Sequence, residues 1–308
     1  MTESVLKLDN VVKTYGDFTA VDGISLEIPK GSIYGFLGPN GAGKTTTIRM
    51  ILDIVKPSSG RITLLGHSCA LDVRNRIGYL PEEKGLYKKM KVWAIIQYFA
   101  RLKGMEKKAA KHKAFALLER YGLIEFADAK IESLSKGMGQ KVQVLSAVAH
   151  DPEFVILDEP FSGLDPVNQT VLEDLITDMA SNGQTVIFST HVMQHAERLC
   201  DRILLISKGK KIFDGTVAQA RATIPRRVLI SSESDISPLQ QLSGVQDITA
   251  TEHNQWRIDI SKDVNPQHIL EFCANAKIAI RGFEFSESSL HDVFVNLVGD
   301  DAKEHVFR

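Results

Sequence analysis

The stretch Gly38-Pro39-Asn40-Gly41-Ala42-Gly43-Lys44-Thr45 decides the fold of this chain. It follows an apolar run, Ile33 to Leu37, that predicts a strand, and it opens a helix predicted from Lys44 to about Ile54. Glycines in such a turn let successive backbone N–H groups converge on a phosphate, and the helix N-terminus adds partial positive charge. The pattern therefore predicts a phosphate-binding P-loop formed by Gly38, Asn40, Gly41, Ala42, Gly43 and Lys44.

Three side chains at the start of this helix have separate predicted roles. Lys44 is expected to reach the β- and γ-phosphates, Thr45 to ligate Mg²⁺, and Thr46 to add a phosphate contact. The alternative is a glycine-rich turn that carries a lysine by chance. From average residue frequencies, the four fixed positions of the pattern coincide by accident in about 1% of chains of this length.

A second strand ends in two adjacent carboxylates. The run Phe154 to Leu157 is wholly apolar and is followed by Asp158 and Glu159. Asp158 is expected to hold Mg²⁺ through its waters, and Glu159 to polarise the water that attacks the γ-phosphate. Such a pair alone is more often an ordinary strand end, but it follows a P-loop here.

Composition sets the broad class. The 308 residues are 44% hydrophobic and 24% charged, as in ordinary globular proteins, and the formal net charge of -1 gives no basic excess for binding a phosphate backbone. Nucleic acid is therefore not an expected partner. The three cysteines (Cys69, Cys200 and Cys273) form no CxxC pair, which favours a reducing cytoplasm. We see neither a leader pattern nor a stretch of about 18 apolar residues, so a transport function would need another chain to form the channel.

The order of the patterns predicts two domains. Short alternating runs between residues 6 and 27 predict a small antiparallel sheet, and further strands are predicted at 61–65, 154–157, 185–189 and 202–206. The apolar character of 154–157 and of the centre of 185–189 indicates parallel strands covered on both faces. Apolar residues at helical spacing in Val92 to Leu102 and Lys107 to Tyr121 predict a helical insertion at about 84–150. Pro225 after a helical stretch predicts a boundary, with residues 1–224 in the first domain and 225–308 in a small α+β domain.

A third motif makes the sequence resemble the ABC ATPase family. Leu134-Ser135-Lys136-Gly137-Met138-Gly139-Gln140-Lys141 is similar to the LSGGQ signature of that family, although Lys136 and Met138 replace a glycine and a glutamine. Taken alone, the motif would be read as a helix cap. The resemblance implies that Ser135 and Gly137 face the γ-phosphate bound by the P-loop of a second copy, so that two chains enclose two ATP molecules.

Other residues match the family in the same order. Ser162-Gly163-Leu164-Asp165 resembles the D-loop, which implies that Asp165 lies at the dimer interface, and His191 stands where the family has its switch histidine. Tyr15 resembles the aromatic residue that stacks on adenine; the alternative is a strand tyrosine packed on the sheet.

One loop departs from the family pattern. Ile77-Gly78-Tyr79-Leu80-Pro81-Glu82 resembles the Q-loop, but Glu82 stands where most members have glutamine. An ionised carboxylate can still meet Mg²⁺, although it cannot donate a hydrogen bond. The longer string IGYLPEEKGLY, together with the small C-terminal domain, resembles a bacterial subgroup of ABC-2-type exporter ATPases that includes those assigned to sodium extrusion.

Basic residues concentrate in the predicted helical insertion. Residues 84–113 contain ten lysines and arginines and one acid, Glu106. The simpler interpretation is a solvated helix face. The alternative is a surface near the anionic inner leaflet, with a groove beside Glu82 and Tyr87 that receives a helix of a membrane subunit.

These observations predict an α/β fold: a P-loop NTPase core with a small antiparallel β-subdomain and a helical insertion, followed by the α+β domain. The resemblance implies an Mg²⁺-dependent ATPase that dimerises around two ATP molecules and drives a separate membrane permease, in the export direction, from the cytoplasmic side of the cell membrane. The alternatives are a soluble ABC ATPase that acts on ribosomes or DNA, and a binding module that does not hydrolyse ATP. The intact Glu159 and His191 oppose the last of these.

Overall fold

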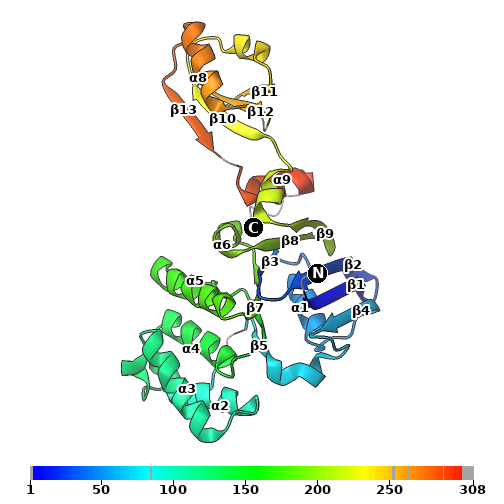
Figure 1. Ribbon diagram of the computed structural model, residues 1–308, viewed down its shortest axis with the longest axis vertical. Helices are drawn as coiled ribbons and strands as arrows, with labels where there is room; N and C mark the ends of the chain where they lie inside the picture. The colour runs from blue at the N-terminus through cyan, green and yellow to red at the C-terminus, as the bar shows by residue number, and fades with distance from the viewer. Residues whose placement is uncertain (1–2, 84, 252–253, 262–263, 287, 300–308) are drawn as a thin grey trace. The chain divides into compact units, whose positions relative to one another are not determined.

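A computed structural model describes residues 3–83, 85–251, 254–261, 264–286 and 288–299 of the chain (Figure 1). Contacts divide the chain into two compact units, Met1–Val217 and Ala218–Arg308. The boundary predicted at Ile224-Pro225 falls just inside the second unit. Within the described residues, no helix combines the length and the apolar character that crossing a bilayer requires.

The first unit is built around a six-stranded sheet with the order β5-β6-β7-β3-β8-β9. Five strands are parallel, and only the edge strand β9 runs antiparallel to its neighbour β8. The central strands β6 and β7 are buried along their whole length, because helices cover both faces of a parallel sheet. The bounds are β3 (Ile33–Leu37), β5 (Ile77–Leu80), β6 (Phe154–Asp158), β7 (Thr185–Thr190), β8 (Arg202–Ser207) and β9 (Lys210–Gly215).

A three-stranded antiparallel sheet, β2-β1-β4, forms the other layer of this unit. Its strands are β1 (Ser4–Tyr15), β2 (Phe18–Pro29) and β4 (Ser59–Leu64), and helix α1 (Lys44–Ile51) follows β3. One hydrophobic core joins side chains of both sheets and of α1, including Leu6, Ile24, Ile48 and Phe154. Helix α1 ends before the predicted Ile54, because Asp53 adopts a left-handed backbone conformation with φ of 60°.

Helices form the rest of the first unit. Helix α2 packs against α3 and α4, and Figure 1 shows these three helices gathered in one group. Helices α5 and α6 contact strands β3 and β7 of the parallel sheet. The bounds are α2 (Val92–Leu102), α3 (Lys107–Arg120), α4 (Lys136–Val148), α5 (Pro166–Ser181) and α6 (Met193–Leu199).

The second unit contains an antiparallel sheet of four strands with the order β11-β12-β10-β13. Alternating apolar residues of β10 and β12, such as Val228 and Ile258, form its core with Ile269 and Cys273 of α8. The bounds are β10 (Arg226–Ser231), β11 (Val245–Ala250), β12 (Gln255–Ile260), β13 (Gly282–Ser286), α8 (Pro266–Asn275) and α9 (Leu290–Val298); the short helix α7 (Val217–Arg221) spans the division between the units.

One strand of the second unit is shorter than its sequence pattern suggests. The run from Lys277 to Phe285 reads as a continuous strand, but β13 begins only at Gly282. The backbone N–H of Ile278 bonds to the carbonyl of Cys273 at 2.9 Å, and Lys277 has a φ of 58°. The first residues of this run therefore form the left-handed turn that ends α8, and they do not pair in the sheet.

Candidate functional site

The P-loop wraps around the N-terminus of α1 and leaves that terminus open. The N-cap residue Gly43 has a φ of 106°, and a Cβ there would lie 2.6 Å from the carbonyl oxygen of Ala20. Only glycine fits this position without strain. Gly43 has no side chain that could cap the first turn, so the backbone N–H groups of this turn can bind an anion.

Lys44 is buried with its ammonium folded back into the loop. Its Nζ donates to the carbonyl of Gly38 at 2.6 Å and to that of Pro39 at 3.1 Å, and it lies 3.6 Å from Oε1 of Glu159. Burial lowers the pKa of Lys44, while the nearby carboxylate of Glu159 acts in the opposite direction. A phosphate would add negative charge here and favour the ammonium form.

Asp158, at the end of β6, is held by neighbours on two elements. Its Oδ1 accepts hydrogen bonds from the hydroxyl of Ser189 and, at 3.4 Å, from that of Thr45. Its Oδ2 is buried and has no hydrogen-bond partner within the part of the chain that the structure describes. Because an unpaired buried carboxylate oxygen is costly, a hydrated cation beside Thr45 would satisfy it.

Glu159 and His191 meet at the carboxyl ends of two adjacent parallel strands. Oε2 of Glu159 lies 3.0 Å from Nδ1 of His191, and the backbone N–H of Glu159 donates to Ser189 Oγ at 3.0 Å. Glu159 has a φ of 48°, an unfavourable conformation for a residue with a side chain. Its Oε1 is buried and makes no hydrogen bond to any residue that the structure describes, so one oxygen is available to a reactant.

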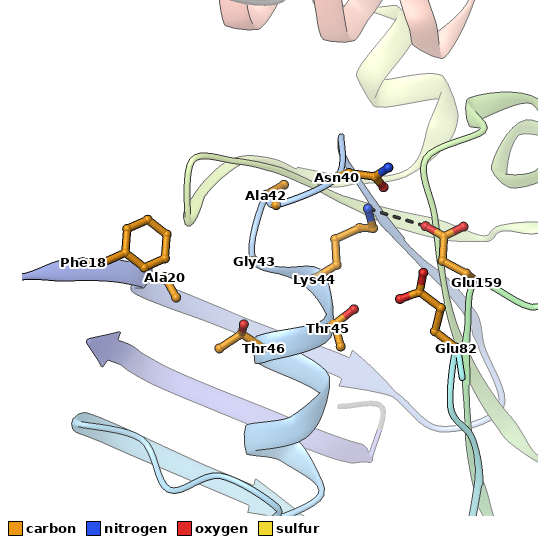
Figure 2. Close-up of a pocket in the computed structure, with 11 residues that line it drawn as sticks. Phe18, Ala20, Asn40, Ala42, Gly43, Lys44, Thr45, Thr46, Glu82 and Glu159 are labelled. Carbon is orange, nitrogen blue, oxygen red and sulfur yellow. Dashed lines mark ion pairs between the residues drawn. The ribbon is translucent and has the colours of Figure 1, made fainter. Parts of the chain in front are cut away.

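These elements form a pocket beside the P-loop (Figure 2). Glu82 and Glu159 lie on one side of Lys44, and Phe18 and Ala20 on the other. Of the predicted site residues, nine line the pocket: Asn40, Gly41, Ala42, Gly43, Lys44, Thr45, Thr46, Glu82 and Glu159.

The aromatic residue in the pocket lining is Phe18, which the sequence analysis missed. The predicted Tyr15 is not part of the lining, but it pairs directly with Phe18 across the β1–β2 hairpin. Both side chains are exposed, Tyr15 to 51% and Phe18 to 63%. The signal that could have identified Phe18 is its position as the first residue of the strand after the turn.

Ser135, Gly137 and Asp165 do not line this pocket. Ser135 caps α4 and accepts a hydrogen bond from the N–H of Met138 at 3.2 Å, while Asp165 caps α5 and accepts one from Asn168 at 2.9 Å. A Cβ on Gly137 would lie 2.5 Å from Nδ2 of Asn168, so the first turns of α4 and α5 are in close contact. The three residues thus lie where the first turns of α4 and α5 meet, an edge of the first unit outside the pocket lining.

Comparison with known proteins identifies the family. The chain is 43% identical over 296 residues to the uncharacterized ABC transporter ATP-binding protein YhaQ of Bacillus subtilis, with 96% of this chain and 99% of the relative covered. The chain belongs to the ABC transporter ATP-binding proteins. Residues 21–162 match the ABC transporter family, and residues 215–298 match the family described as the C-terminal domain of DrrA1-3-like ATP-binding proteins.

Other ABC transporter proteins are similar over about 70% of the chain. The Nod factor export ATP-binding protein I of Burkholderia orbicola is 39% identical over 218 residues, which cover 70% of this chain and 72% of the relative. The solved structure of cbiO1 from Clostridium perfringens, described as part of the ABC transporter complex cbiONQ, aligns with a TM-score of 0.64 at 27% identity. That alignment covers 70% of this chain and 89% of cbiO1, and it confirms the predicted P-loop fold.

An ABC ATPase of this kind hydrolyses ATP, and the residues present fit Mg²⁺ as its cation. Within the described ranges, no group of three or more His, Cys, Asp or Glu side chains could hold a metal ion by itself. Mg²⁺ commonly uses one or two protein ligands together with the phosphates of its substrate. The free oxygen of Asp158 and the hydroxyl of Thr45 match that requirement, with Glu82 as a further carboxylate in the pocket.

Proposed function

We propose that this chain is the ATP-hydrolysing subunit of an ABC exporter, acting as a homodimer on the cytoplasmic side of the membrane and driving a separate permease. The observation that carries the proposal is the convergence of Lys44, Glu159 and His191. Oε1 of Glu159 lies 3.6 Å from Nζ of Lys44, and Oε2 of Glu159 lies 3.0 Å from Nδ1 of His191, beside the P-loop. A cation, a carboxylate and a histidine placed in this way support a role in the transfer of a γ-phosphoryl group to water.

Each residue has a distinct part in the proposed reaction. The ammonium of Lys44 exchanges its bonds to Gly38 and Pro39 for the β- and γ-phosphate oxygens. Glu159 accepts a proton from the attacking water, and His191 orients the carboxylate that does so. Bound Mg²⁺ would neutralise charge on the phosphates.

The edge formed by Ser135, Gly137 and Asp165 supports a dimer. These residues match motifs that bind nucleotide in the family, yet they do not line the pocket of their own chain. The N-terminus of α4, which Ser135 caps in the single chain, would then contact the γ-phosphate held by a second copy. One chain alone would leave each nucleotide half enclosed.

A groove in the first unit supports docking of a membrane partner. It lies between the loop that follows β5 and helices α2 and α4, and its lining includes Pro81, Leu86, Phe99 and Ala147. Tyr87, which follows Leu86 in the sequence, is exposed and packs edge-on against Tyr98, with the ring centroids 5.8 Å apart. Export is supported by the relative named for Nod factor export.

The substitution Glu159→Gln tests the proposed chemistry. We expect the purified variant to bind ATP and to hydrolyse it about 100-fold more slowly or worse, because an amide cannot accept the proton. The ATP-bound variant should also sediment as a dimer at concentrations where the nucleotide-free protein is monomeric. Glu153→Gln is the control, since Glu153 pairs with Arg76 away from the pocket. Near-normal turnover in Glu159→Gln would remove this residue from the mechanism.

A further inference from the structure

A second histidine, His195, is buried close to the reactive pair but belongs to no motif. It lies four residues after His191, on α6, and is only 4% exposed. Its ring stacks on that of Phe161, with centroids 4.1 Å apart and planes inclined by 14°. Phe161 in turn packs edge-on against Phe188 of β7 at 5.7 Å.

A ring nitrogen of His195 contacts an ion pair. Its Nδ1 lies 3.3 Å from Oε1 of Glu173 on α5, and Glu173 pairs with Arg198 at 2.6 Å. Burial lowers the pKa of His195, which favours the neutral ring. With its proton on Nδ1 the ring donates to Glu173, and with its proton on the other nitrogen it accepts from Arg198 at 3.2 Å. Either tautomer therefore keeps the ring linked to the same pair.

Phe161 belongs to the loop that joins the catalytic carboxylate to the predicted dimer edge. This loop, residues 159–165, begins at Glu159 and ends at Asp165. Buried Gln140 of α4 donates to the carbonyl of Pro160 at 3.0 Å, and Gln169 of α5 donates to that of Leu164 at 3.1 Å. The stack on His195 connects the loop to α6, the helix that directly follows His191.

A histidine is a costly choice if this position only fills space. Burying a polar ring is unfavourable unless its nitrogens find partners, whereas phenylalanine would pack against Phe161 without that cost. The link to Glu173 and Arg198 gives the ring a fixed orientation. The unfavourable backbone of Glu159 also needs surroundings that hold the loop in place.

We propose that His195 is a positioning residue for the proposed ATP hydrolysis: through Phe161 and Glu173 it fixes loop 159–165 against α5 and α6. This keeps the carboxylate of Glu159 at hydrogen-bond distance from His191 and holds Asp165 at the edge. The inference depends on the proposed hydrolytic function. His195 is not among the residues that line the pocket.

The substitution His195→Phe keeps the aromatic stack and removes the link to Glu173. We expect kcat for ATP hydrolysis to fall about tenfold, with KM and ATP affinity unchanged, because the loop moves while the P-loop does not. Glu173→Ala removes the partner of His195 in this link and should lower kcat to a similar extent. Glu173→Gln should partly restore kcat. The double variant His195→Phe/Glu173→Ala should be no slower than Glu173→Ala alone, because Glu173→Ala already breaks the link to His195 along with the pair to Arg198.

His150→Phe is the matched control. This histidine is also partly buried and contacts a backbone carbonyl, that of Ile77, but it lies outside loop 159–165 and should leave kcat unchanged. The inference is overturned if folded His195→Phe keeps kcat within about twofold of the wild type, or if the losses in the double variant multiply. A wild-type protein without ATPase activity would instead refute the proposed function, and this inference with it.

Discussion

Two aromatic residues at the tip of one hairpin bear on how the nucleotide base is held. Tyr15 and Phe18 are direct cross-strand partners, and Phe18 lines the pocket on the side away from Glu159. Large aromatic side chains this exposed are poor contributors to a core. We therefore expect both rings to contact adenine, Phe18 as part of the lining and Tyr15 beside it.

Replacing either ring with alanine should weaken ATP binding by about fivefold to tenfold, since base–aromatic stacking contributes about 1 kcal/mol or more. Binding of inorganic triphosphate should not change, because the proposed phosphate contacts do not involve these two rings. Titration of each variant with both ligands checks this. Phe126→Ala is the control, as an exposed ring on the short turn Ile124–Phe126. Loss in only one variant would identify the single residue that stacks.

The sequence predicted the residues of contiguous motifs better than those brought in by folding. Asp158 ends a strand, and Lys44, Glu159 and His191 each follow one. The carboxyl ends of neighbouring parallel strands meet at one edge of a sheet, which brings these residues together. Phe18 and His195 could not be predicted, because neither residue belongs to a motif with a fixed spacing. One depends on the turn of a hairpin, and the other on how α6 packs against the loop after β6.

At the scale of elements, the N-termini of α4 and α5 fit together through a single glycine. Asn168 is held in place by Asp165, which accepts from its side chain at 2.6 Å, and it fills the space that a Cβ on Gly137 would need. Lys136 lies so close to Gly163 that a side chain there would collide with it. The departure from the signature motif thus directs a positive charge onto loop 159–165.

Gly137→Ala should therefore separate the two helix ends. We expect overpacking to lower stability by about 1–3 kcal/mol and ATP-dependent dimerisation to be lost, since Ser135 and Asp165 would no longer share an edge. Gly139→Ala, two residues along α4, is a matched control: its Cβ meets nothing within 4 Å, so the change should be tolerated. Thermal melts and sedimentation with ATP measure both effects. Equal behaviour of the two variants would show that the contact with Asn168 is unimportant.

Element boundaries were predicted well wherever the hydrophobic pattern was strong. Helix α2 has the predicted bounds, because its apolar residues recur at helical spacing over its whole length. The antiparallel strands were predicted as short runs, but β1 and β2 each extend over 12 residues. Several shifts of register interrupt their pairing, and each shift breaks the alternation by which a strand is recognised.

At the scale of the whole molecule, the basic stretch from 84 to 113 divides into lysines with and without a structural role. Lys91 pairs with Asp128 at 2.8 Å, and Lys113 pairs with Asp151 at 2.7 Å. Lys103 donates to two backbone carbonyls, and burial lowers its pKa. Exposed Lys88 and Lys89 have no such ion pair within the described residues, and Lys88 lines a hollow with Leu86 and Ser135.

This distribution makes Lys88 and Lys89 the informative pair for contact with a membrane partner. We expect Lys88→Glu/Lys89→Glu to reduce copurification with the permease severalfold while leaving the ATPase activity of the isolated subunit unchanged, because each lysine near an anionic leaflet contributes about 1 kcal/mol. Lys107→Glu/Lys108→Glu is the matched charge reversal at the start of α3. Loss in the first variant alone locates the contact beside the groove, whereas loss in both indicates general attraction to the membrane surface. Normal assembly of both variants would mean that the basic residues form only a solvated helix face, which is the simpler interpretation of the sequence.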